Sequence, residues 1–122
     1  MYSAELLDHF QNPRNAGDIQ DADATAAVEN PGCGDVIRLS LKLDGNRIVD
    51  IRFKAKGCVP AMACASALTE LVRGRTLLEA KLVRREDVAA VVGELPAASA
   101  HAAQLALDAL SAALGSMRKK SS

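Results

Sequence analysis

The three cysteines of this chain are the residues that could take part in the most kinds of chemistry. Cys58 and Cys64 lie in the stretch KGCVPAMACAS, and Cys33 lies upstream in NPGCGD. Thiols of this kind can pair as disulfides, bind a metal, or fill the core as small apolar groups. The odd number of cysteines, without a signal-peptide pattern, predicts reduced thiols in a cytoplasmic protein and disfavours a disulfide framework.

Cys58 is expected at the N-terminus of a helix, because Gly57 precedes it and Pro60, a common first-turn residue, follows it. The helix dipole stabilises a thiolate there, and the thiolate is the form that binds metal or attacks sulfur. We therefore favour a functional role for Cys58 over a small buried hydrophobe. Cys64, six residues further on, shares the buried register of this helix, so we predict that it packs in the core.

Three further positions complete a candidate metal-binding set. Cys33 stands between Gly32 and Gly34, where the backbone can approach a ligand closely, and Asp35 follows. Asp35 could equally be an ordinary hydrogen-bonding turn residue, and His101, near the start of the last helix, an ordinary surface histidine. Two thiolates, a carboxylate and an imidazole together suit zinc or iron, although their spacing matches no short CxxC pattern.

A predicted β-hairpin positions the first two of these motifs. Residues 36–43 and 48–55 each alternate apolar and polar side chains, which is typical of strands with one buried face. The tetrapeptide DGNR (44–47) between them supplies the turn.

The register of the hairpin brings Cys33 toward Cys58. Apolar side chains share one sheet face when Leu41 lies opposite Val49 or Ile51. Extending either register puts Cys33 level with the position just before or just after Cys58. Cysteines that merely filled the core would have no reason to meet at the open end of a hairpin.

The remaining elements are predicted helices. A short helix covers 3–10, another spans 60–73, one or two short ones lie within 77–95, and a long one covers 98–117. Strands followed by helices predict an α+β fold, with a small antiparallel sheet and C-terminal helices packed on one face. We expect residues 1–122 to form a single domain.

Two helices have a predicted apolar side. In the first helix it consists of Leu6, Leu7 and Phe10, while His9 shows no pattern that suggests a function. In the last helix it is a stripe of five residues: Ala103, Leu107, Leu110, Leu114 and Met117.

The composition argues against several classes of partner. Lys plus Arg number 15, as do Asp plus Glu, so no long-range attraction to nucleic acid or to an anionic membrane is expected. The basic triplet at 118–120 is interpreted as a solvated terminus. No apolar run approaches the ~18 residues of a membrane span.

These motifs resemble the iron–sulfur cluster assembly scaffolds, IscU and the N-terminal domain of NifU. DHFQNPRNAGD is similar to the opening segment of that family, and NPGCGD to its first cysteine motif. FKAKGCVPAMACASALTELVRG is similar to its second cysteine and following helix, and ELP with His101 continues the match. The resemblance covers roughly residues 2–117.

The resemblance implies a binding protein, not an enzyme, that holds a nascent 2Fe–2S cluster, or zinc in its place. Cys33, Cys58 and His101 would be ligands, and Asp35 the weak ligand that keeps the cluster labile. A cysteine desulfurase would deliver sulfur, and apo-proteins would receive the cluster. A cluster bridging two subunits would make the protein a homo-oligomer.

The chain also departs from the family pattern. The third family cysteine, which accepts persulfide sulfur, is replaced by Ala102, and a family lysine by Ser99. The segment LPAAS replaces the family motif Leu-Pro-Pro-Val-Lys, so docking of the dedicated Hsp70 chaperone is not expected. Two alternatives therefore stay open: a zinc-binding member that has lost cluster assembly, and an enzyme with Cys58 as nucleophile and His101 as base.

Overall fold

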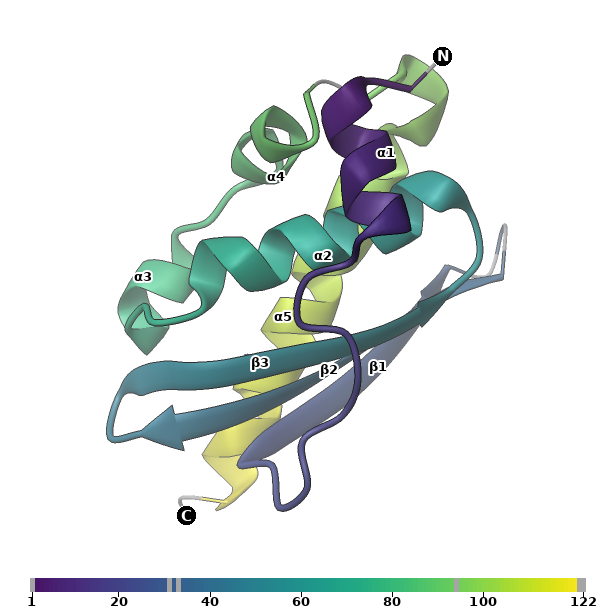
Figure 1. Cartoon of the computed structure of the whole chain (residues 1–122). Coiled ribbons are helices and arrows are strands. Elements are labelled where there is room, and N and C mark those ends of the chain that lie inside the picture. Colours follow the sequence, from purple (N-terminus) through teal and green to yellow (C-terminus); the bar gives the residue numbers. More distant parts are fainter. Residues whose placement is uncertain (1, 31, 33, 94, 121–122) are drawn as a thin grey trace.

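Helices cover one face of a small antiparallel sheet in this protein (Figure 1). The computed structural model describes residues 2–30, 32, 34–93 and 95–120, with only the backbone of 98 and 117–120. The α+β architecture predicted from the sequence is confirmed. Among the helices of this described part, none has both the length and the apolar character needed to cross a membrane.

The sheet has three strands in the order β1-β2-β3: Ala24–Asn30, Asp35–Asp44 and Arg47–Lys56. The predicted hairpin is β2–β3, and Leu41 lies opposite Ile51, which is one of the two predicted registers. The register shifts by one residue only near the turn. Apolar side chains of both strands therefore meet on the face that the helices cover.

Strand β1 was not predicted from the sequence. Its inward-facing positions are Ala24, Ala26 and Val28, and alanine is a poor strand former, so the apolar alternation is faint. The strand forms because it pairs antiparallel with β2 along its whole length and packs under α5. Its last residue, Asn30, lies opposite Asp35.

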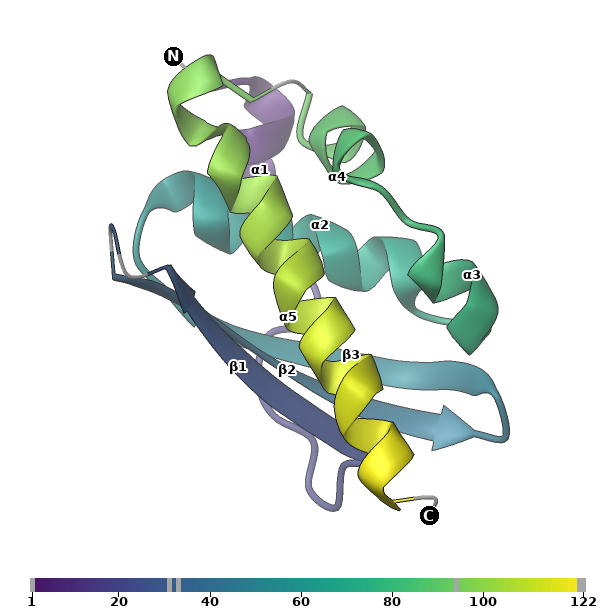
Figure 2. The same ribbon diagram turned by 180° about the vertical axis from the view of Figure 1, so that it is seen from behind.

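The helices occupy the predicted parts of the chain: α1 (Ala4–Gln11), α2 (Val59–Val72), α3 (Leu77–Lys81), α4 (Arg85–Val91) and α5 (Ala100–Lys120). The long helix starts slightly later than predicted, because Ala97–Ser99 form a 3-10 turn after Pro96. Helix α2 packs on β3, while α5 runs diagonally over β1 and β2 (Figure 2). Helix α1 lies on α2, away from the sheet.

The buried side of α1 differs from the prediction. Ser3 is the N-cap, and its hydroxyl accepts the Leu6 N–H at 3.0 Å, as expected. Leu6 is fully buried, but Leu7 is 38% exposed, and His9 is buried in its place. The prediction for Leu7 was wrong because α1 presents to α2 the face that carries positions 6 and 9.

The buried side of α5 consists of paired positions on successive turns, and it includes most of its alanines. These residues are Ala102, Ala103, Leu105, Ala106, Ala109, Leu110, Ala113 and Leu114. Leu107, which was predicted to lie in the stripe, is only partly buried, and the prediction for Met117 falls on a side chain outside the described part. Small side chains let the helix axis approach the sheet closely.

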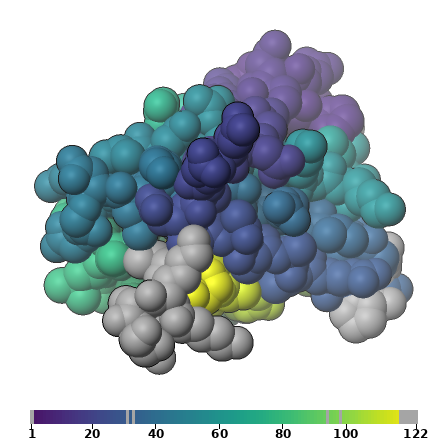
Figure 3. All heavy atoms as spheres, turned by 90° about the horizontal axis from the view of Figure 1, so that it is seen from below, coloured from purple at the N-terminus to yellow at the C-terminus, as the bar shows by residue number. Residues whose placement is uncertain are grey.

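The segment between α1 and β1 lies across the outer face of the sheet (Figure 3). Asn15 accepts the Phe53 N–H at 3.0 Å, and Gly17 donates to the Phe53 carbonyl at 2.8 Å. The Asp18 carboxylate lies 2.9 Å from Lys54 Nζ and 3.4 Å from Arg38 Nε. This segment therefore forms hydrogen bonds with the free main-chain groups at the edge of β3. It also supplies a carboxylate to the basic side chains on the outer face of the sheet.

Candidate metal centre

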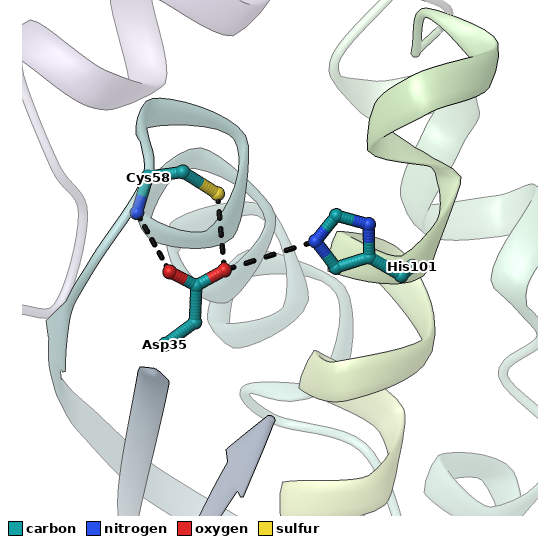
Figure 4. Close-up of side chains that lie close together, drawn as sticks. All are labelled: Asp35, Cys58 and His101. Atoms are coloured by element: carbon teal, nitrogen blue, oxygen red, sulfur yellow. Dashed lines mark hydrogen bonds and ion pairs between the residues drawn. The ribbon is translucent and has the colours of Figure 1, made fainter. Parts of the chain in front are cut away.

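Three side chains from separate elements meet at one end of the sheet (Figure 4). Asp35 is the first residue of β2, Cys58 immediately precedes α2, and His101 is the second residue of α5. One potential ligand atom from each residue lies within 4.8 Å of the other two. The fold thus brings together three of the four residues predicted as ligands.

The fourth predicted ligand, Cys33, lies outside the described residues, so its role stays a prediction. The glycines on either side of it are both held by Asn30. The Gly32 N–H donates to the Asn30 side chain at 3.0 Å, and the Gly34 N–H to the Asn30 carbonyl at 2.7 Å.

Asp35 is the central residue of the site. It is only 2% exposed, yet it carries a carboxylate. Its Oδ1 accepts the main-chain N–H of Cys58 at 2.9 Å, its Oδ2 accepts from the Cys58 thiol at 3.2 Å, and Oδ2 lies 3.8 Å from His101 Nε2. These interactions offset the cost of taking a carboxylate out of water.

The N-terminus of α2 favours negative charge at this point. Cys58 is the N-cap residue, as predicted, with extended backbone (φ −75°, ψ 159°) and no capping bond from its own side chain. The Asp35 carboxylate fills the capping role from the neighbouring strand. The positive end of the helix dipole therefore faces both the carboxylate and the thiol.

His101 closes the site from the side of α5. Its side chain is 40% exposed, so the centre opens to solvent beside it. The next residue, Ala102, is fully buried. Position 102, where the resemblance implies a third cysteine, therefore faces the interior of the protein.

Cys64 takes no part in the centre. It is fully buried among apolar side chains of the core, as its helical register predicted. Burial, together with the nearby Cys58, raises the pKa of the Cys64 thiol to about 12. A thiol that stays protonated at neutral pH is a poor metal ligand.

His9 is a buried polar residue that sequence reasoning left without a role. Its Nδ1 lies 2.8 Å from Ser66 Oγ, and its Nε2 lies 3.4 Å from Glu70 Oε1. Ser66 Oγ also accepts the Arg14 N–H at 2.9 Å, so one hydroxyl contacts both His9 and the main chain that follows α1. Burial, with a smaller contribution from the positive charge of Arg14, lowers the pKa of His9.

This cluster joins α1 to α2, and it is separate from the group of three potential metal ligands. Ser66 and Glu70 are four residues apart on α2, a spacing that puts them on one helix face. The spacing was visible in the sequence, but nothing there indicated that His9 would pack against that face.

The donor set fits a metal ion. Thiolate, carboxylate and imidazole are the three side-chain ligands of zinc, and a tetrahedral site separates neighbouring ligand atoms by about 3.3–3.8 Å. The distances of 3.2 Å from Cys58 Sγ and 3.8 Å from His101 Nε2 to Asp35 Oδ2 are close to that range. Three protein donors leave at least one coordination position for a further ligand.

The whole chain, residues 1–122, matches the family model of the NifU-like N terminal domain. The chain belongs to this family. Among its relatives is the iron–sulfur cluster assembly scaffold protein IscU 1 of Archaeoglobus fulgidus, which is 46% identical over 93% of this chain and 74% of the relative. The IscU scaffold of Escherichia coli K12 is 39% identical over 98% of this chain and 95% of the relative.

Solved structures of similar fold include NifU-like N-terminal and SUF-system proteins. A Brucella abortus NifU-like N-terminal protein has a TM-score of 0.78 and 20% identity, covering 97% of this chain and 94% of that one. A SUF-system scaffold of Fervidobacterium islandicum has a TM-score of 0.79 and 23% identity, covering 93% and 96%. These likenesses confirm the NifU-like fold of the α+β domain.

Proposed function

We propose that this NifU-like protein is a scaffold on which a labile 2Fe–2S cluster is assembled and from which it passes to apo-proteins. The observation that carries the proposal is the meeting of Asp35, Cys58 and His101 at one solvent-open end of a chain from this family. Cys33 is the fourth proposed ligand. The protein would bind the cluster as cargo and catalyse no turnover of its own.

Each residue has a separate proposed part in holding the cluster. The Cys58 thiol donates a hydrogen bond to Asp35, and binding iron replaces that proton. Asp35 offers an oxygen, which binds cluster iron less strongly than a thiolate does and would keep the cluster exchangeable. His101 adds a nitrogen ligand, as mixed Cys and His ligation does in other clusters.

The proposed partners follow from this role. A cysteine desulfurase would supply sulfur, and apo-proteins that need a cluster would accept the product, in the cytoplasm. A cluster shared between two copies would make the protein a homo-oligomer. The segment LPAAS gives no basis for docking of the dedicated Hsp70 chaperone.

A second candidate is a zinc-binding protein that has lost cluster assembly. It is favoured by Ala102, which removes the thiol that would accept sulfur at that position. The three donors that remain together would still hold zinc.

Metal and sulfide analysis separates the two candidates. The protein is purified anaerobically, then analysed for iron, zinc and acid-labile sulfide before and after reconstitution with iron, cysteine and a desulfurase. Equal iron and sulfide with visible charge-transfer absorption, followed by transfer to an apo-ferredoxin, would support the scaffold. One zinc per chain that iron does not displace, without sulfide, would support the zinc protein and overturn the scaffold.

A further inference from the structure

Gly57 lies against the buried carboxylate of Asp35. Its φ is +134°, and a Cβ built on its backbone would lie 2.0 Å from Asp35 Oδ1, 2.7 Å from Cγ and 2.9 Å from Cα. Real Cβ atoms essentially never come closer than 3.0 Å to a heavy atom outside their own residue and its two chain neighbours. Any other residue at position 57 would therefore collide with the side chain and backbone of Asp35.

The same contact determines how Asp35 is oriented. Gly57 directly precedes Cys58, whose main-chain N–H holds Asp35 Oδ1 at 2.9 Å. With Oδ1 held there, the carboxylate turns Oδ2 toward Cys58 Sγ and His101 Nε2. The space over Gly57 is thus what allows one oxygen to cap α2 while the other faces the donor atoms.

We propose that Gly57 is a positioning residue for the metal centre, and that through it Asp35 binds metal by the single oxygen Oδ2. This inference rests on the proposed function only in taking a metal as the ligand of the site. A carboxylate can also bind a metal through both oxygens. When Oδ2 alone binds the metal, Oδ1 keeps its hydrogen bond to the Cys58 N–H at the start of α2. The metal is then released more easily.

A steric role can be separated from backbone strain, because the chain supplies a matched control. Gly17 has a similar φ of +125°, and a Cβ built there meets nothing within 4 Å. Gly17→Ala therefore introduces comparable strain without touching the centre. Gly57→Ala introduces the strain and also displaces the Asp35 carboxylate.

Cobalt(II) alone is the probe for this test, since it occupies zinc-type sites and its absorption reports the ligands. Gly57→Ala should weaken cobalt binding roughly tenfold or more, as loss of a supporting partner does, and should change the ligand-field bands. Gly17→Ala should keep the wild-type affinity and spectrum. Equal affinities and spectra for Gly57→Ala and Gly17→Ala would overturn the proposal.

A double-mutant comparison tests whether Gly57 acts through Asp35. Once Asp35→Ala has removed the carboxylate, adding Gly57→Ala should change cobalt affinity no further. Additive losses would show that Gly57 acts by some other route and would count against the proposal. Circular dichroism and thermal unfolding of each variant establish that the compared proteins are folded.

Infrared difference spectra of the wild-type protein test the binding mode even if Gly57→Ala does not fold. The carboxylate bands that change on cobalt binding are assigned to Asp35 by their loss in Asp35→Asn. A wide splitting of the two carboxylate stretches is expected for one-oxygen binding, and a narrow splitting would overturn it. If cobalt binds as described but no cluster ever forms, the proposed function fails and this inference stands.

Discussion

The main-chain N–H of Cys58 donates to Oδ1 of Asp35 at 2.9 Å, so the first residue of β2 caps a helix whose N-cap residue lies 23 residues later in the chain. The same carboxylate faces the thiol of Cys58 and the imidazole of His101 through its other oxygen. Ligand geometry and the start of α2 are therefore coupled. Changes that move the helix end should also change metal binding.

Replacing Cys58 by alanine should abolish metal binding while the fold is kept. The cap on Asp35 is made by the main-chain N–H, which Cys58→Ala retains. We expect cobalt or zinc affinity to fall by at least the roughly 10–100-fold that loss of a mere supporting partner costs. Metal titration checks the affinity, and circular dichroism checks the fold; wild-type affinity in this variant would remove Cys58 from the site.

Replacing Cys64 by alanine is the matched comparison for Cys58→Ala. It should lower the stability of the fold and leave metal binding intact. Cys64 is fully buried in the core, so the variant should lose about 1 kcal/mol of unfolding free energy by leaving a small cavity. Its metal affinity should match the wild type. Urea unfolding and metal titration on the same preparation measure both quantities, and lost metal binding would contradict the assignment of Cys64 to the core.

The buried cluster that joins α1 to α2 should make stability depend on pH below neutrality. Burial lowers the pKa of His9 from its ordinary 6.5, so the unfolded chain binds this proton more readily than the folded one. The contribution of His9 to stability is therefore complete above pH 6.5 and is lost as pH falls through the lowered pKa.

Urea unfolding between pH 5 and pH 8 measures this dependence, with a slope that cannot exceed about 1.4 kcal/mol per pH unit for one proton. Arg14 opposes protonation of His9, while Glu70 and Asp8 favour it. His9→Gln should flatten the profile in this range. A wild-type slope that His9→Gln leaves unchanged would assign the pH dependence to another group.

Ser66→Ala should destabilise the protein, because Ser66 Oγ is bonded to both His9 Nδ1 and the Arg14 N–H. Leaving such buried groups unsatisfied typically costs about 1–3 kcal/mol. Ser111→Ala, at an exposed position on α5, should change stability by less than about 0.5 kcal/mol. Thermal and urea unfolding of the two variants compare them directly; equal effects would mean that the cluster contributes nothing to the docking of α1.

The sequence by itself determined the features that depend on local periodicity. Alternation along β2 and β3 predicted the hairpin and limited its register to two choices, because a slip by one residue would expose the apolar side chains. Helical spacing assigned Cys64 to the core, and Gly57 with Pro60 placed Cys58 at a helix start. Each of these follows from neighbours within a few residues.

The tertiary structure alone decided the features that depend on which helix and strand faces pack against one another. Strand β1 carries alanines, so its position comes from pairing with β2 and covering by α5. His9 is buried because α1 docks on α2 at Ser66. The orientation of Asp35 depends on its close contact with Gly57, the residue that directly follows β3. Such contacts join surfaces far apart in sequence, and no local pattern encodes them.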